Sequence, residues 1–437
     1  MNTDDFVNAE MNRRRFLGEG ARNAASAAAA GVVGWHASRS AASGSPVETM
    51  RVGVIGVRSQ GKVLAIETAH LPGVDVAAVC DVDETMLLRA TQELGKHQPR
   101  VPRPYRDFRR LLDDPTIDAV LIATPDHWHA AMSVLACRAG KDVYVEKPVA
   151  QTIHDGNVMI SVAEREGRIV QCGLQQRSGE HFQSAVEFVR SGGLGKVRLA
   201  KAWSVHRRQP LGNSADAGPP SGVDYDLWQG PAAARPFNVN RFHYHWRWCW
   251  DYGTGELGNW GVHLLDIARL GLGVDLPERI AATGSPPPGD GNSQTPDTLT
   301  VQYAYPEATI LWEHRLWTHH GNEGRPTGTA FYGDCGTLVV DRSGWKVYDT
   351  SESLTADASE LRRAHLEDFY HAVRNRSRPA CDLHTGQISS TLCHLGNIAY
   401  RLGREVAFDP QAQNFGDDRA ANEFLTRATR SPWELPT

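Results

Sequence analysis

The sequence predicts an α/β protein in which a doubly wound parallel sheet is followed by an α+β domain with a mostly antiparallel, open sheet. Two observations carry this prediction. Between residues 50 and 172, short apolar runs alternate with helical patterns, as in repeated βα units. From residue 173 to 437 the apolar runs and the loops are longer, and the alternation stops.

Length and composition fit this organisation. The chain has 437 residues, of which 41% are hydrophobic and 22% charged, with a formal net charge of −5; two domains with separate cores are expected at this length. No basic stripe with interleaved aromatic residues occurs, so we expect no nucleic-acid partner. After the first 45 residues no apolar run is long enough to span a membrane. The 7 cysteines are widely spaced and are predicted to be buried free thiols.

Residues 1–45 have the layout of an export signal. The twin arginine Arg13-Arg14 precedes Arg-Phe-Leu, and a short alanine-rich stretch at 24–35 and a group of small residues follow. This order resembles the signal that the Tat export machinery reads. We therefore expect that machinery as a partner and a periplasmic or other extracytoplasmic location. The alternative is an amphipathic or disordered leader that stays attached.

A strand, a glycine turn and a helix follow one another from residue 50. Residues 51–55 form a β-rich apolar run, the turn extends from Gly56 to Gly61, and residues 62–71 show helical spacing. This context predicts a dinucleotide site in which backbone N–H groups at the start of the helix bind the pyrophosphate. A plain βα loop without a ligand is the alternative interpretation.

Asp81 and Arg58 bear on which dinucleotide is bound. Asp81 ends the next strand, at 74–79, where a carboxylate can accept hydrogen bonds from the adenosine ribose and repel a 2′-phosphate. NAD is therefore expected, with NADP less favoured. Arg58 replaces the middle glycine of the Gly-x-Gly-x-x-Gly pattern, and its guanidinium could bond a phosphate oxygen or reach the adenosine.

The alternation continues with strands at 119–123 and 142–145 on either side of a helix at 127–139. Ligands of doubly wound sheets bind at the carboxyl ends of the strands. The residues that follow these two strands are therefore expected beside the cofactor: Thr124, Pro125, His127, Glu146 and Lys147.

Residues 173–437 are predicted to form the substrate domain. Strands are expected at 197–205, 299–305, 309–316, 330–332 and 337–340, with loops at 210–224 and 284–296. The predicted substrate wall consists of Gln175, Gln176, Arg177, Trp228, Arg247 and Trp250.

Aromatic residues gather in the segment 242–250, interleaved with His243, His245 and Arg247. Flat tryptophan faces and fixed polar donors suit a sugar ring, whereas a core layer or an oligomer interface is the alternative. The two histidines lack a third ligand at suitable spacing, so no metal is expected. In the helix that follows, Asn259 and His263 are four residues apart and are expected on one face.

Four motifs together resemble the Gfo/Idh/MocA family, the oxidoreductases of the glucose-fructose oxidoreductase and inositol dehydrogenase type. They are Gly53-Val54-Ile55-Gly56, Thr124-Pro125-Asp126-His127, Glu146-Lys147-Pro148 and Gly261-x-His263-x-x-Asp266. The resemblance implies a Rossmann domain that binds NAD, a second domain whose sheet covers the nicotinamide, a homo-oligomer, and hydride transfer with a sugar or polyol. It also implies that Lys147 contacts substrate and nicotinamide and that His263 is the acid/base, with Asp266 in support.

Asn259 departs from the family pattern, which has an aspartate at this position. An aspartate would raise the pKa of His263, whereas an amide can only orient that histidine or the substrate. Here the chain is similar to the NAD-dependent α-N-acetylgalactosaminidase branch, which oxidises a sugar transiently, eliminates the aglycone, adds water and returns the hydride. Three functions stay open: a sugar or polyol dehydrogenase, a redox glycosidase or lyase, and a non-catalytic NAD-bound sensor or scaffold.

Overall fold

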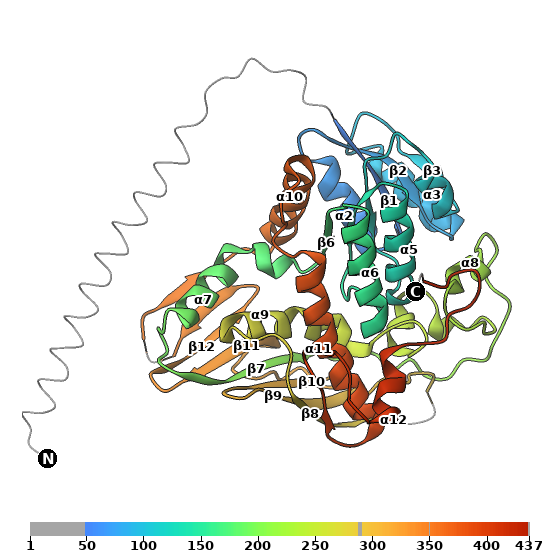
Figure 1. Cartoon of the computed structure of the whole chain (residues 1–437). Coiled ribbons are helices and arrows are strands. Elements are labelled where there is room, and N and C mark those ends of the chain that lie inside the picture. The colour runs from blue at the N-terminus through green and yellow to red at the C-terminus, as the bar shows by residue number, and fades with distance from the viewer. Residues whose placement is uncertain (1–48, 287–290, 349, 436–437) are drawn as a thin grey trace, which may run out of the picture. The chain divides into compact units, whose positions relative to one another are not determined.

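The computed structural model describes residues 49–437 apart from 287–290, 349 and 436–437 (Figure 1). The predicted export signal at 1–45 lies outside the described residues. Within them, no helix combines the length and the apolar character needed to cross a bilayer. The seven cysteines are free; six are buried as predicted, whereas Cys335 is exposed.

The first sheet has six strands in the order β3-β2-β1-β4-β5-β6, and all its pairings are parallel. The strand order reverses between β1 and β4, which is where doubly wound sheets bind their ligands. Every residue of β4 and β5 is buried, as expected for central parallel strands covered on both faces. The strands are β1 Met50–Ile55, β2 Val74–Cys80, β3 Arg103–Tyr105, β4 Ala119–Ile122, β5 Asp142–Val145 and β6 Val170–Cys172; the helices are α2 Gln60–Ala69, α3 Glu84–Leu94, α4 Phe108–Leu112, α5 Asp126–Arg138 and α6 Ile153–Arg165.

The second sheet has nine strands in the order β14-β13-β12-β11-β7-β10-β9-β8-β15. Its pairings are antiparallel except that of β7 with β10. Burial alternates along β9 and β10, so one face of the sheet packs on helices and the other is more open. The strands are β7 Val197–Val205, β8 Arg279–Ser285, β9 Thr298–Ala304, β10 Thr309–Arg315, β11 Thr327–Gly333, β12 Gly336–Asp341, β13 Gly344–Val347, β14 Ser353–Thr355 and β15 Val406–Ala407.

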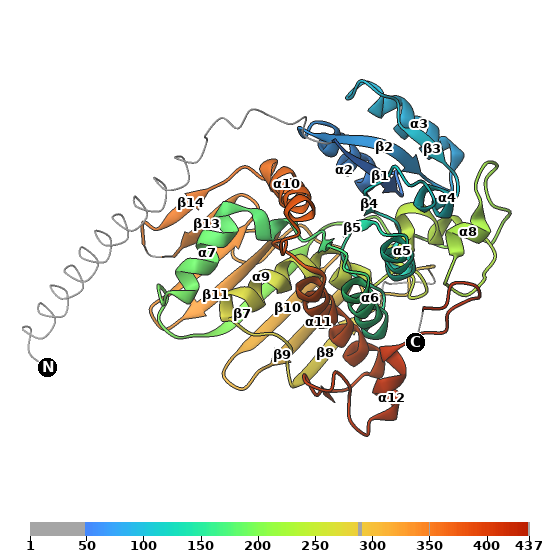
Figure 2. The same ribbon diagram turned by 45° about the horizontal axis from the view of Figure 1, so that its top comes forward.

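Three helices of the second half, α7 (Glu180–Arg190), α9 (Val262–Leu272) and α11 (Leu383–Leu402), lie over one face of this sheet (Figure 2). A π-helical turn, Leu257–Gly261, leads into α9. The remaining helical segments are η1 Gln175–Ser178, α8 Tyr225–Gln229, η2 Val239–Arg241, η3 His243–Trp248, α10 Glu360–Asn375, α12 Arg419–Asn422 and η5 Glu423–Leu425. The parallel and antiparallel sheets confirm the predicted fold class.

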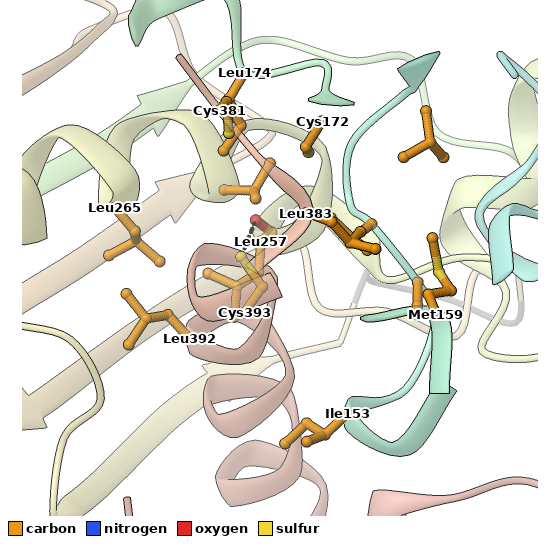
Figure 3. Close-up of a cluster of buried hydrophobic side chains, with 14 of the residues drawn as sticks. Ile153, Met159, Cys172, Leu174, Leu257, Leu265, Cys381, Leu383, Leu392 and Cys393 are labelled. Atoms are coloured by element: carbon orange, nitrogen blue, oxygen red, sulfur yellow. Dashed lines mark hydrogen bonds between the residues drawn. The ribbon is translucent and has the colours of Figure 1, made fainter. Parts of the chain in front are cut away.

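The C-terminal helices return to the first half. Helix α10 packs against α2, and the hydroxyls of Thr68 and Tyr370 are hydrogen-bonded at 2.9 Å. Helix α11 packs against α6 and α9, so side chains of both halves share one apolar core, in which Cys393 Sγ donates to the carbonyl oxygen of Leu257 at 3.2 Å (Figure 3). This shared core fixes α9 and its π turn relative to the first sheet.

Candidate active site

A cleft of about 300 Å³ lies at the carboxyl ends of β1, β2, β4 and β5. Its opposite wall comes from segments between residues 227 and 263, from the turn between β12 and β13 and from the start of α10. The polar and charged residues that line it are Arg58, Ser59, Gln60, Asp81, Thr124, Asp126, Glu146, Lys147, Gln175, His243, Tyr244, Arg247, Asn259, His263, Arg342 and Arg362. Among the described residues, no group of three or more histidine, cysteine, aspartate or glutamate side chains is arranged to hold a metal ion.

The glycine turn at the end of β1 forms one end of the cleft. Gly56 has φ of +84°, and a Cβ there would lie 2.8 Å from the carbonyl oxygen of Ala123, so only glycine fits. Arg58 is exposed at the turn and lines the cleft. Gly61 does not line it: a Cβ at Gly61 would lie 1.9 Å from Gly56 O, so this glycine permits close packing of α2 on the turn.

Asp81 lies at the end of β2 beside this turn. Its Oδ2 accepts a hydrogen bond from Val57 N at 2.9 Å, and its Oδ1 accepts one from Asp83 N at 3.0 Å. Burial raises the pKa of Asp81 to about 6, partly opposed by these two hydrogen bonds. Each carboxylate oxygen has a further lone pair for a ligand hydroxyl.

The ends of β4 and β5 contribute further polar groups. Thr124 Oγ1 is buried without a hydrogen-bond partner and, with Pro125, lines the cleft. Glu146 Oε1 accepts hydrogen bonds from Gln60 Nε2 at 3.0 Å and Gln175 Nε2 at 3.2 Å. The unpaired hydroxyl and the glycine cradle are features that a bound dinucleotide would satisfy.

Lys147 crosses from the first half to the second. Its Nζ donates to the backbone oxygen of Asn259 at 2.9 Å and to Asn259 Oδ1 at 3.3 Å. The π turn presents this backbone oxygen to the lysine. The other end of the Asn259 amide donates to Glu256 Oε2 at 3.2 Å, and Glu256 is paired with Arg208 at 2.9 Å. Burial lowers the pKa of Lys147 below its usual 10.5.

His263 lies one turn further along α9 and is 4% exposed. Its Nδ1 is buried without a hydrogen-bond partner. Burial, together with the positive charges of Lys147 and Arg342, lowers the pKa of His263 well below 6.5. The imidazole is therefore neutral and can accept a proton. No hydrogen bond joins Asn259 to His263 among the described residues; the amide holds Lys147 instead.

An aromatic wall faces these groups. The Arg247 guanidinium lies 4.3 Å from the ring centroid of Trp246 and 4.6 Å from that of Tyr244. Trp260 lines the cleft between the His206 ring, at 5.1 Å, and the Arg342 guanidinium, at 4.7 Å. Trp228 also lines the cleft. This wall offers flat apolar faces beside fixed cations.

Besides Gly61, four residues predicted to bind cofactor or substrate do not line the cleft: His127, Gln176, Arg177 and Trp250. His127 is fully buried, with Nε2 3.0 Å from the Trp228 backbone oxygen, and joins α5 to the second half. Gln176 is also buried, behind the cleft wall in η1. Arg177 forms a bidentate ion pair with Asp266, at 2.7 and 2.8 Å, and so serves the core. The Trp250 ring packs under Arg401 at 4.9 Å.

Comparison with known proteins identifies the chain. Residues 50–174 match a family model described as "Oxidoreductase family, NAD-binding Rossmann fold", and residues 211–435 match one described as "Oxidoreductase family, C-terminal alpha/beta domain". The chain belongs to the Gfo/Idh/MocA oxidoreductase family. The first half accordingly has the NAD-binding Rossmann fold, and the family match confirms the resemblance seen in the motifs.

Individual relatives are more distant. The chain is 31% identical over 164 residues to an alpha-N-acetylgalactosaminidase of Shewanella oneidensis; the match covers 37% of this chain and 36% of that protein. Levoglucosan dehydrogenase in complex with NADH and levoglucosan superposes with a TM-score of 0.66 at 18% identity, over 82% of this chain and 99% of that one. An aldose-aldose oxidoreductase from Caulobacter crescentus gives 0.62 at 20% identity, over 82% and 100% of the two chains. These structures share the fold of this Gfo/Idh/MocA chain.

Sequence reasoning did not include several residues of the cleft in this Gfo/Idh/MocA chain. Gln60, the first residue of α2, lines the cleft, and Glu256, which does not line it, accepts a hydrogen bond from Asn259. Both stand next to known motifs in the sequence, and that position was a usable signal. Arg342, in the β12–β13 turn, and Arg362, in the first turn of α10, reach the cleft only through tertiary structure. No local pattern marks them.

Proposed function

We propose that this protein oxidises a hydroxyl-bearing carbon of a sugar or polyol and transfers the hydride to NAD. The observation that carries this proposal is the meeting of Lys147 and His263, from two halves of the chain, in a cleft that also contains the glycine turn and Asp81. His263 is buried and Lys147 half-buried, and each retains hydrogen-bonding capacity that no protein group uses.

The dinucleotide would be held by residues of the Rossmann domain. Asp81 would accept hydrogen bonds from the adenosine ribose, Gly56 and Arg58 would face the pyrophosphate, and Thr124, Pro125 and Glu146 would border the nicotinamide ribose and ring. When bound, NAD supplies the electrophilic carbon that accepts a hydride.

Lys147 and His263 would act on the substrate hydroxyl. The Nδ1 atom of His263, which has no hydrogen-bond partner in the described part of the chain, would accept the hydroxyl proton as the carbon–oxygen bond gains double-bond character. Lys147 uses two donors on Asn259, so its third N–H remains to stabilise the developing carbonyl oxygen. Asn259 is then a positioning residue for Lys147.

A sugar or polyol suits the remaining wall. The rings of Trp246 and Trp260 provide flat faces for the C–H face of such a ligand, and neighbouring polar side chains provide donors and acceptors. Structural neighbours that carry sugar substrates in their names support the same class.

The direct test is hydride transfer. Protein lacking the leader would be mixed with NAD and a panel of sugars and polyols while NADH absorbance and product are followed. NADH should accumulate in step with an oxidised sugar. Lys147→Ala should lower turnover about a hundredfold or more while NAD binding persists. Lys96→Ala, which removes an exposed surface lysine outside the cleft, is the control for folding and loading; near-normal turnover by Lys147→Ala would contradict the proposal.

A second candidate is a redox glycosidase, in which the sugar is oxidised only transiently. It is favoured by Asn259 and by the match to the Shewanella alpha-N-acetylgalactosaminidase. The same residues would act, but the hydride would return in each cycle. Release of aglycone from a glycoside without accumulating NADH would identify this reaction and exclude net dehydrogenation.

We also propose that residues 1–45 direct export through the Tat machinery and that the protein is an extracytoplasmic homo-oligomer. The support is the Arg13-Arg14 motif and the apolar stretch behind it. Replacing Arg13 and Arg14 with lysine should retain the precursor in the cytoplasm, and normal export of that variant would contradict the proposed Tat signal. Light scattering of the leaderless protein tests the oligomer.

A further inference from the structure

The cleft carries more positive than negative charge. Its cations are Arg58, Lys147, Arg247, Arg342 and Arg362, and its carboxylates are Asp81, Asp126 and Glu146. The charge of a bound dinucleotide's pyrophosphate would be met at the glycine turn, where Arg58 and the start of α2 lie. Positive charge away from the glycine turn is only weakly compensated, because Arg362 has a carboxylate, on Glu67, no nearer than 3.9 Å.

Arg342 is the most unusual of these cations. Within the described part of the chain, no carboxylate lies within ion-pair distance of its guanidinium, and its Nε is buried without a hydrogen-bond partner. Arg325, which precedes β11 and donates to Gly344 O of this hairpin at 3.1 Å, is different because it is paired with Asp341 at 2.7 Å. Arg342 instead lies flat over Trp260, 4.7 Å from the ring centroid, which leaves its N–H edge free for a ligand.

Arg362 extends the same feature. Its Nε is also buried without a partner, and its nearest carboxylate, on Glu67, is 3.9 Å away, at the limit of an ion pair. Burial lowers the pKa of Arg342, the positive charge of Arg362 lowers it further, and the charge of Glu146 acts in the opposite direction. Arg342 and Arg362 thus line the same cleft with only weak compensation from carboxylates, which an anionic ligand would complete.

Arg342 lies toward the substrate end of the cleft. Its guanidinium is 4.7 Å from the ring centroid of Trp260, the residue that follows Asn259. Its charge is also among those that lower the pKa of His263, whereas the arginine that acts on Asp81 is Arg58. Arg342 is therefore next to the proposed acid/base rather than next to the adenosine, and Arg362 lines the same cleft from the first turn of α10.

We propose that Arg342 and Arg362 form a subsite for an anionic substituent, so that the substrate is an acidic sugar, bearing a carboxylate or a sulfate ester, rather than a neutral one. That the ligand is a sugar or polyol rests on the proposed function. Guanidinium groups bind such anions through two parallel N–H donors, and burial beside Trp260 strengthens the interaction by excluding water.

The test compares acidic sugars with their neutral counterparts. NAD-loaded protein would be titrated with galacturonate, glucuronate and galactose 6-sulfate, and with galactose and glucose, by calorimetry and by NADH formation. Wild type should favour acidic over neutral partners, and Arg342→Gln and Arg362→Gln should each reduce this preference about tenfold or more. Arg363→Gln, on the next position of α10 but exposed and paired with Glu367, is the matched control and should retain the preference.

The outcomes separate the two proposals. Turnover with equal or better use of neutral sugars overturns the anionic subsite and leaves the oxidoreductase proposal standing. Selective binding of an acidic sugar that is lost in Arg342→Gln, without turnover, supports the subsite and overturns the proposed reaction. Loss of NAD affinity in Arg342→Gln assigns the arginines to the cofactor and overturns the subsite, as does binding of inorganic sulfate as tight as that of any sugar. Failure of every acidic sugar to bind also overturns it.

Discussion

Two residues three positions apart on α9, His263 and Asp266, are both buried yet have opposite surroundings. Asp266 accepts hydrogen bonds from Arg177 at 2.7 and 2.8 Å and from Ser389 Oγ at 2.5 Å, and Arg269 lies 3.4 Å away. His263 Nδ1 has no partner and the ring lines the cleft. One helix thus presents a satisfied charge to the core and an unsatisfied base to the cleft.

This contrast separates stability from chemistry. Removing one partner of a buried, fully paired charge lowers the free energy of unfolding by several kcal/mol. A buried polar group without a partner destabilises the ligand-free protein, and its role is to interact with a bound ligand. Variants of the two regions should therefore fail in different assays.

The largest expected effect on stability is that of Arg177→Ala. Removing this arginine leaves Asp266 buried with weaker compensation, so the free energy of unfolding should fall by about 3–5 kcal/mol, measured by chemical denaturation. Arg190→Ala, at the exposed end of α7, should change it by less than about 0.5 kcal/mol. Loss of turnover with unchanged stability would place Arg177 in the chemistry after all.

The same pair gives a pH dependence. Arg177 and Arg269 hold the pKa of Asp266 below its ordinary 3.8 against the effect of burial. The stabilisation by this pair is thus fully present above pH 3.8 and is lost as the pH falls through the lower folded-state pKa. Arg177→Ala should flatten the acid limb of the stability profile, and an identical limb in the variant would assign it to other carboxylates.

A smaller effect is expected for NAD affinity. Asp81→Ala should weaken NAD binding by about 1–3 kcal/mol and improve the relative affinity for NADP. Because the pKa of Asp81 is about 6, NAD affinity of the wild type should fall as the pH drops below that value. Isothermal titration at several pH values checks both statements; unchanged affinity in the variant would mean that Arg58 controls selection.

The subtlest prediction concerns Asn259. In Asn259→Asp a carboxylate would adjoin Lys147 Nζ and raise the pKa of Lys147, which burial otherwise lowers. The basic limb of the kcat/KM profile should then move to higher pH. Asn375→Asp, on the exposed end of α10, should leave the limb in place, and a limb unmoved by Asn259→Asp would exclude Lys147 as its source.

Local sequence patterns predicted the fold well because each half has its own pattern: βα alternation in residues 50–172 and longer apolar runs and loops from residue 173. The strand at 197–205 matches β7 at both ends, and the parallel pairing of the first sheet follows from the βα alternation. The positions of Asp81, Thr124 and Lys147 after strands of the parallel sheet likewise predicted that they line the cleft, as the structure shows. Sequence alone did not reveal the parallel pairing of β7 with β10, because direction depends on the chain's path and not on side-chain alternation.

The site was harder to predict where tertiary contacts decide a role. Arg177 and His127 carry polar groups suited to ligands, yet partners distant in sequence, Asp266 and Trp228, satisfy them. Asn259 was expected near His263 from helical spacing, but the π turn changes that spacing and gives the amide to Lys147. Arg342 reached the cleft without any local signal.

The most direct test of the central claim compares His263→Ala with Asp266→Asn in one preparation. We predict that His263→Ala unfolds at the wild-type temperature, binds NAD normally and loses hydride transfer about a hundredfold or more. Asp266→Asn should instead unfold at a lower temperature because its arginine partners lose their counter-charge. A His263→Ala protein that turns over substrate at nearly the wild-type rate would contradict the account.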